Sequence, residues 1–144
     1  MKSTLKKRVM VAATPESAPV AMRALQGHYE AHICTSLAMA REILAERVDA
    51  ILCGIYFAES KMFDLLHLVK ANEQNKSAPF LCVKANEGIL SPVLLQSIEM
   101  ASKTLGADGF VDLSEWRKTL GDEAAYARLQ QMIDRLIDRQ PCTE

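Results

Sequence analysis

The residues best suited to chemistry are two cysteines inside short apolar runs. Cys53 lies in the run Asp49–Ile55, and Cys82 lies in the run Pro79–Val83. If these runs are neighbouring strands, the two thiols lie near the same end of one sheet, which would suit a thiol-based redox sensor or enzyme. A reactive thiol needs a nearby cation or a helix N-terminus, and Lys84 is the nearest candidate cation. The alternative is that both cysteines pack as small hydrophobic residues in a core.

Other side chains that commonly build chemical sites are scattered. The four cysteines, Cys34, Cys53, Cys82 and Cys142, contain no CxxC pair, which argues against a disulfide framework or a zinc site. The three histidines, His28, His32 and His67, are separated in sequence, fall on different expected elements and have no metal-ligand spacing. No glycine-rich loop follows the first apolar run, so nucleotide or FMN binding is not predicted. The sequence therefore predicts no cofactor.

Length and charge limit the classes of protein that fit. A chain of 144 residues suits one domain, with a core from about residue 8 to residue 139. A net charge of −1 gives no signal for nucleic acid as a partner. No apolar run approaches the roughly 20 residues that span a bilayer, and the short run Val9–Ala13 is too brief for a signal peptide. We therefore predict a cytoplasmic protein with no membrane partner.

Apolar runs of strand length alternate with helical patterns along the chain. The expected strands are Arg8–Ala13, Ala31–Cys34, Asp49–Ile55, Pro79–Val83 and Phe110–Val111. The expected helices begin near Pro15, Leu37, Lys61 and Ser91, and a last helical region is broken near Gly121. Such alternation forces parallel strands with right-handed crossovers. The predicted fold is α/β, a doubly wound five-stranded parallel sheet flanked by helices.

The run Asp49–Ile55 is the predicted central strand, because it is apolar on both faces. Ligands and reactive groups of open parallel sheets lie at the carboxyl ends of such strands. Gly54 stands at that end of this strand, and glycine has no side chain to react. The predicted centre of the sheet therefore lacks the group that chemistry would need.

The order of the elements and three short sequence segments resemble the receiver domain of two-component response regulators, which has a flavodoxin-like fold. The resemblance covers about Arg8 to Arg139. Val9–Pro15 is similar to the first strand with its Asp-Asp-x-Pro turn, and Asp49–Phe57 is similar to the third strand with its phospho-accepting aspartate. Leu105–Val111 reads LGADGFV and is similar to the approach to the fifth strand.

The resemblance implies a phosphorylation site, and this sequence departs from it at each position. Receivers hold Mg²⁺ with an acidic pair after the first strand and accept phosphate on an aspartate. A hydroxyl and a lysine orient the phosphoryl oxygens. The acidic pair matches Ala12 and Ala13, the aspartate matches Gly54, the hydroxyl matches Lys84, and the lysine matches Leu113. The resemblance therefore implies a degenerate site with no metal and no catalytic residue.

Some nearby charged residues are candidates to replace the missing groups. Glu16 and Glu59 are expected near the rim of the pocket, and Asp112 precedes Leu113. A rescued acidic site is one alternative, although an acidic residue in a first helical turn commonly complements the helix dipole. Lys84 would be costly to bury without an acidic pair. We expect it to extend outward or to reach Glu59.

The predicted function is that of a stand-alone, non-catalytic pseudo-receiver that takes part in signal transduction through protein contact. The resemblance implies a partner that is a histidine kinase, a response regulator or another signalling protein, or a second copy in a homodimer. The usual partner face of receivers is built from the fourth helix, the fifth strand and the last helix. In this chain that face would contain Phe110, Trp116 and Tyr126.

Overall fold

The structure is a computed structural model that describes residues 6–85 and 91–139, without the side chains of residues 59 and 60. Its strands are β1 (Lys7–Ala12), β2 (Tyr29–Cys34), β3 (Ala50–Gly54), β4 (Phe80–Lys84) and β5 (Gly109–Asp112). Its helices are α1 (Ala18–Leu25), α2 (Leu37–Ile43), α3 (Phe57–Ser60), α4 (Met62–Lys70), α5 (Pro92–Thr104), α6 (Leu113–Leu120) and α7 (Asp122–Asp138).

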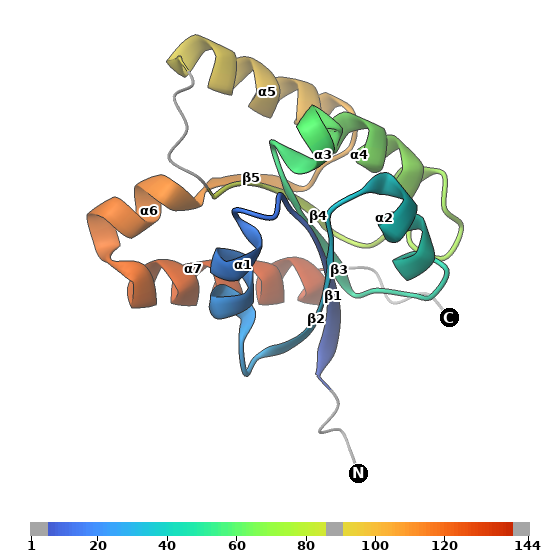
Figure 1. Cartoon of the computed structure of the whole chain (residues 1–144), viewed down its shortest axis with the longest axis horizontal. Coiled ribbons are helices and arrows are strands. Elements are labelled where there is room, and N and C mark those ends of the chain that lie inside the picture. Colours follow the sequence, from blue (N-terminus) through green and yellow to red (C-terminus); the bar gives the residue numbers. More distant parts are fainter. Residues whose placement is uncertain (1–5, 86–90, 140–144) are drawn as a thin grey trace.

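The strands form one parallel sheet in the order β2-β1-β3-β4-β5 (Figure 1). This confirms the predicted doubly wound fold with Asp49–Ile55 at its centre. The chain leaves β1 toward β2 on one side and reaches β3 on the other, so the topological switch point lies between β1 and β3. The register aligns Ala12 with both Cys34 and Cys53, and Cys53 with Cys82.

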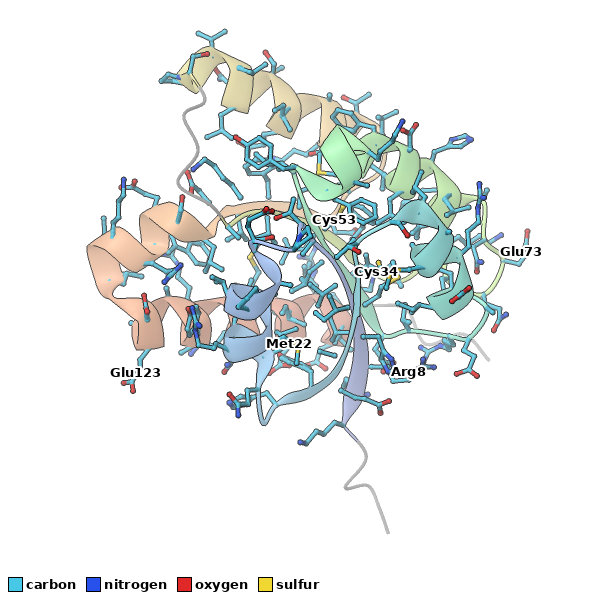
Figure 2. All side chains as sticks on the ribbon, in the orientation of Figure 1. Arg8, Met22, Cys34, Cys53, Glu73 and Glu123 are labelled. Atoms are coloured by element: carbon cyan, nitrogen blue, oxygen red, sulfur yellow. The ribbon has the colours of Figure 1, made fainter. Side chains whose placement is uncertain are left out.

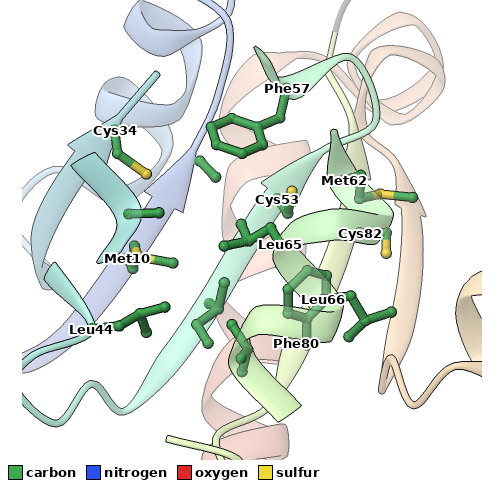
Figure 3. Packing of buried hydrophobic residues seen from close by; sticks show 14 of the residues in the cluster. Met10, Cys34, Leu44, Cys53, Phe57, Met62, Leu65, Leu66, Phe80 and Cys82 are labelled. Atoms are coloured by element: carbon green, nitrogen blue, oxygen red, sulfur yellow. The ribbon is translucent and has the colours of Figure 1, made fainter. Parts of the chain in front are cut away.

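Two layers of helices cover the sheet, one on each face (Figure 1). On one face, α2, α3 and α4 enclose a core that contains Met10, Ile51, Phe57 and Phe80 (Figure 3). On the other face, α1 and α7 enclose a second core with Leu129 and other buried aliphatic residues. Because both faces are covered, the central strands are apolar throughout.

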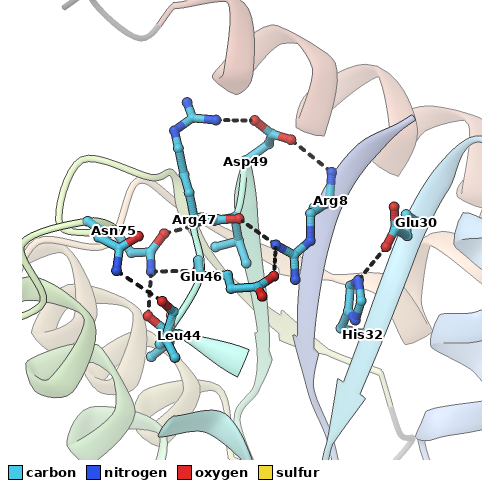
Figure 4. A network of polar contacts seen from close by, with 11 residues as sticks. Arg8, Glu30, His32, Leu44, Glu46, Arg47, Asp49 and Asn75 are labelled. Atoms are coloured by element: carbon cyan, nitrogen blue, oxygen red, sulfur yellow. Dashed lines mark hydrogen bonds and ion pairs between the residues drawn. The ribbon is translucent and has the colours of Figure 1, made fainter. Parts of the chain in front are cut away.

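Polar contacts fix the amino ends of the strands (Figure 4). The backbone N–H of Arg8 donates to the Asp49 carboxylate at 2.8 Å, and the Arg8 guanidinium donates to Glu46 at 3.0 Å. Asn75 is completely buried, and its side-chain oxygen accepts the Val48 N–H at 2.8 Å. These contacts satisfy backbone groups that the sheet itself leaves unpaired. They hold the end of the sheet that is opposite the candidate site.

A tyrosine joins the last helix to the sheet. The Tyr29 hydroxyl donates to the Asp134 carboxylate at 2.6 Å and contacts the Gln130 carbonyl at 3.0 Å. Burial and the neighbouring Asp134 raise the pKa of Tyr29 far above its ordinary value. Gln130 also donates to the Ala24 carbonyl at 2.6 Å. These bonds fix α7 against β2 and α1.

The first helix differs from the sequence prediction. The helix begins at Ala18 and not near Pro15, because Thr14 and Ser17 bond to each other: each hydroxyl accepts the other residue's backbone N–H, at 3.2 and 3.1 Å. This reciprocal pairing makes a turn before the helix. Met22 is 48% exposed, and its side chain is labelled in Figure 2. The buried residues of the helix are Ala24 and Leu25.

The segment after β3 also differs from expectation. The sequence predicts a loop over Tyr56–Ser60, whereas the segment contains the short helix α3. Phe57 is completely buried and anchors this helix in the core, which explains why the segment is ordered as a helical turn. Ala58 adopts a φ of +46°, which L-residues rarely adopt.

The last helical region is confirmed as two helices that meet at Gly121. Gly121 has a φ of +86°, which glycine adopts without strain and which ends α6 before α7 begins. The inner face of α7 includes Leu129 and Ile133, as the amphipathic pattern predicts. Within residues 6–85 and 91–139, no helix is both long and apolar enough to cross a bilayer.

Candidate functional site

The carboxyl edge of the sheet brings four of the five predicted site positions around one cavity. Ala12 ends β1 and Ala13 follows it, Gly54 ends β3, and Leu113 begins α6. All four line a cavity of about 30 Å³ at the topological switch point. The fifth position, Lys84, ends β4 but does not line this cavity. The structure therefore brings these four positions together, as the order of elements predicts.

The wall of this cavity is almost entirely hydrocarbon. Its other lining residues are Val11, Ser17, Ala21, Leu52, Val83, Ala85 and Leu129. The hydroxyl of Ser17 is engaged by Thr14 at 2.9 Å. No carboxylate lines the cavity in the described part of the chain, and in those same residues no group of three or more His, Cys, Asp or Glu could hold a metal ion. The donor set does not fit Mg²⁺, which requires oxygen ligands.

The glycine at the end of β3 is not required by crowding. A Cβ placed on Gly54 would meet its nearest atom, the Ala12 carbonyl oxygen, at 3.6 Å, which is an ordinary contact. A residue with a side chain would therefore fit this position. The fold therefore does not require glycine at position 54.

Lys84 does not extend outward, so this part of the expectation was wrong, whereas a contact with Glu59 stays a prediction because the Glu59 side chain lies outside the described residues. Lys84 is only 7% exposed, and its ammonium donates to the Ser114 hydroxyl at 2.9 Å. Ser114 donates in turn to the Asp112 carboxylate at 2.7 Å, and the Lys84 nitrogen lies 3.8 Å from the same oxygen. Asp112 also accepts the backbone N–H of Glu115 at 3.0 Å and caps α6. The buried charge is thus compensated by the last residue of β5 and the first turn of α6.

Two of the carboxylates considered as replacements, Glu16 and Asp112, do not line the cavity. Glu16 lies exposed on the rim and lines a shallow outer groove with Thr14, Thr35 and Tyr56. Asp112 is engaged by Lys84 and Ser114. The side chain of Glu59 lies outside the described residues. Among the side chains that the structure describes, one exposed glutamate does not supply the paired carboxylates that a divalent cation prefers.

The thiols lie together but in an environment that suppresses their reactivity. Cys34, Cys53 and Cys82 are each 0% exposed, and Cys53 and Cys82 are neighbours across β3 and β4 (Figure 3). Burial raises the pKa of Cys34 to about 11 and that of Cys82 to about 11. Burial also raises the pKa of Cys53 well above its ordinary value. Reactive cysteines show the opposite shift, and Cys142 lies outside the described residues.

These thiols should make the fold sensitive to alkali. Below the ordinary thiol pKa of 9.0, a buried thiol is protonated in both the folded and the unfolded protein, so its contribution to the free energy of unfolding does not change with pH. As the pH rises from 9.0 to about 11, the unfolded thiol ionises while buried Cys34 does not, so stability falls by about 1.4 kcal/mol per pH unit for each such thiol. Urea unfolding across this range measures the slope.

The matched variant for this experiment is Cys34→Ala. Its free energy of unfolding should fall less steeply with pH than that of the wild type, and the difference in slope should be the contribution of one thiol. At neutral pH the variant should be less stable than the wild type, because the substitution leaves a small cavity. Equal slopes in the two proteins would show that the Cys34 thiol already ionises near its ordinary pKa.

Comparisons with known proteins bear on the fold. No family model matches the chain, and no curated protein matches it. Solved structures do match. The receiver domain of a sensor histidine kinase from Pseudomonas aeruginosa, with magnesium coordinated in its active-site cleft, has a TM-score of 0.69 at 18% identity, and the match covers 92% of this chain and 98% of that one. The chain has the receiver-domain fold.

Further receivers match over similar lengths. A phosphorylated cyanobacterial phytochrome response regulator has a TM-score of 0.70 at 12% identity, and the match covers 96% of this chain and 99% of that one. A chemotaxis response regulator from Vibrio cholerae has a TM-score of 0.63 at 19% identity, with 89% and 98% covered. At these identities the comparisons establish the receiver fold.

The three aromatic residues expected on the partner face of the receiver fold do not lie together. Phe110 is half-buried against the core that contains Met10 and Phe57, whereas Trp116 and Tyr126 pack on the core of the opposite face. Arg128 covers the Trp116 ring, with its guanidinium carbon 4.3 Å from the ring centroid. Packing and this cation–π contact already engage these rings. All three rings are only partly buried, and their place on a partner face stays a prediction.

Proposed function

We propose that this chain is a non-catalytic signalling module of receiver type that is not switched by aspartyl phosphate at the usual site. The supporting observation is the cavity at the switch point between β1 and β3. Its wall carries Ala12, Ala13, Gly54 and Leu113 where phosphoryl transfer would need carboxylates and a cation. A wall of alkyl groups offers neither a nucleophile nor ligands for Mg²⁺.

The one buried cation at this edge of the described chain supports the same proposal. Lys84 is held against Ser114 and Asp112, and these contacts join the ends of β4 and β5. A residue fixed in this way holds the two strand ends in a single arrangement. The module therefore keeps one conformation irrespective of phosphate, and it acts through the proteins that bind its outer surface. The proposed partners are a histidine kinase, a response regulator, another signalling protein or a second copy.

The proposal is tested by the response to a phosphoryl analogue. Thermal unfolding of the full chain is measured alone, with Mg²⁺, and with Mg²⁺ and beryllofluoride. Since the cavity wall offers no ligands for either, the melting temperature should stay the same in all three conditions. A rise that depends on both Mg²⁺ and beryllofluoride would show that a functional acidic site exists.

A further inference from the structure

The cavity at the switch point exists because small residues line it. Its wall contains four alanines and Gly54, and their short side chains leave a volume of about 30 Å³ unfilled. One water molecule needs roughly 10–15 Å³ by this measure, so the cavity has room for about two water-sized groups. It is therefore large enough to hold part of a small ligand.

Water is a poor occupant of this cavity. A buried water molecule needs about two to four polar partners around it. The only polar side chain in the described wall is Ser17, and its hydroxyl is already engaged by the Thr14 hydroxyl at 2.9 Å. The Val83 carbonyl beside Gly54 accepts the Ile55 N–H at 3.1 Å. An alkyl group therefore fits this wall better than water does.

Two further hollows connect the cavity to the surface. A narrow neck of about 10 Å³ shares four lining residues with the cavity, namely Ser17, Gly54, Val83 and Ala85. The shallow outer groove, with a volume of about 530 Å³, shares Thr14 and Tyr56 with the neck. Helix α1 lies on one face of the sheet beside this path, and α3 lies on the other (Figure 1). A short chain can therefore extend from the cavity through the neck to the surface.

The polarity of the lining changes along this path. The cavity is hydrocarbon, whereas the outer groove carries three residues with hydroxyl groups, Thr14, Thr35 and Tyr56, and the carboxylate of Glu16. Among the described residues that line the three hollows there is no lysine, arginine or histidine. A negative head group in the groove would meet Glu16 without a compensating cation, whereas a hydroxyl or an ammonium would not be repelled.

We propose that this path binds a small aliphatic alcohol or amine, with its alkyl chain in the cavity and its head group in the outer groove. The cavity and the neck together have room for about three carbon atoms below the carbon that bears the head group. So few buried carbon atoms give a dissociation constant in the millimolar range. The inference rests on the proposed function in one respect, since the path is open to such a ligand only while no phosphoryl group occupies the same edge.

An NMR titration of the ¹⁵N-labelled full chain with 1-butanol, n-butylamine and butyrate tests the inference. The three probes carry the same propyl chain below the head-bearing carbon. Butanol and butylamine should shift the amide signals of Gly54, Tyr56 and Ala85, which line the path, and the shifts should saturate at millimolar concentration. Butyrate should bind at least about fivefold more weakly, because Glu16 repels its carboxylate and the described path holds no cation.

Two substitutions fill the cavity from opposite sides. Ala21→Leu adds an alkyl group from α1, and Gly54→Val adds one from β3, where a Cβ meets its nearest atom at 3.6 Å. Each should weaken butanol binding by at least about tenfold, because the added side chain takes the place of the ligand's chain. Ala18→Leu is the matched control, because Ala18 lies in the same helix and packs on the same core but does not line the cavity. Urea unfolding checks that the variants keep the fold.

The outcomes separate this inference from the proposed function. Shifts that rise without saturation, or butanol binding that both filling variants leave unchanged, overturn the ligand site. Equal weakening by Ala18→Leu also overturns it, and butyrate binding as tight as that of butanol overturns the assigned head group. If Mg²⁺ with beryllofluoride raises the melting temperature while butanol still binds, the proposed function fails and the ligand site stands. If neither probe class has an effect, the ligand site fails and the proposed function stands.

Discussion

Replacement of Phe57 by alanine should lower the free energy of unfolding by about 3–5 kcal/mol. Phe57 is 0% exposed and lies in the core with Ala12, Cys34 and Cys53 (Figure 3). Its removal leaves a cavity that the surrounding strands cannot close. The loss comes from packing alone, because alanine is a good helix former in the short helix α3.

The control for this experiment is Phe63→Ala. Phe63 belongs to α4 and packs on the same core, but it is only half-buried. Its ring already contacts water in part, so the loss should be about half as large or less. Urea unfolding of the two variants and the wild type gives the comparison. If Phe63→Ala were the more destabilising of the two, Phe57 would not be the anchor of α3.

Replacement of Asp112 by alanine should lower the free energy of unfolding by about 3 kcal/mol. Two effects combine in this variant. The buried Lys84 ammonium loses the carboxylate 3.8 Å away, and α6 loses the cap that accepts the Glu115 N–H. The expected loss of stability is smaller than for a fully buried ion pair, because the Asp112 side chain is 30% exposed and water screens part of the interaction.

A double-mutant cycle separates the charge effect from the cap. Lys84→Met keeps the volume of the buried side chain and removes its charge, so Asp112→Ala in that background should cost only about the 1 kcal/mol of a lost helix cap. Urea unfolding of the four proteins measures the coupling. Losses that add without coupling would show that the contact between Lys84 and Asp112 contributes nothing to stability.

The fold could be predicted from the sequence because its signals are local. The central strands are short apolar runs, and most helices have a stripe or a breaker beside them, such as Gly121 between α6 and α7. The position of the site follows from the same order, since parallel strands place their carboxyl ends at one edge. The order of elements is therefore sufficient to predict that Ala12, Ala13, Gly54 and Leu113 lie together.

The errors concern contacts that the local pattern does not specify. Lys84 is paired with Ser114, thirty residues further along the chain, and no local pattern links the two residues. The predicted start of α1 is wrong because Thr14 and Ser17 use their hydroxyls for a turn, whereas the proline signal alone favours a helix at Pro15. The pattern Thr-x-x-Ser before an apolar stretch was the available signal for that turn.

The aromatic partner face was predicted from the resemblance, and the structure distributes its residues over both sides of the sheet. Phe110 belongs to a strand whose neighbouring side chains alternate between the faces, while Trp116 follows on α6. Which face receives each ring depends on how α6 leaves β5, and a sequence pattern does not specify that geometry.

The central claim is that the carboxyl edge of this receiver fold cannot accept a phosphoryl group. The most direct measurement is the intact mass of the full chain after incubation with acetyl phosphate and Mg²⁺, followed by peptide mapping. The cyanobacterial phytochrome response regulator, whose phosphorylated form has this fold, serves as the positive control. The account predicts that the control gains a phosphoryl group and that this chain keeps its mass. A phosphoryl adduct mapped to the carboxyl ends of β1, β3 or β4, or to the segments that follow them, would contradict it.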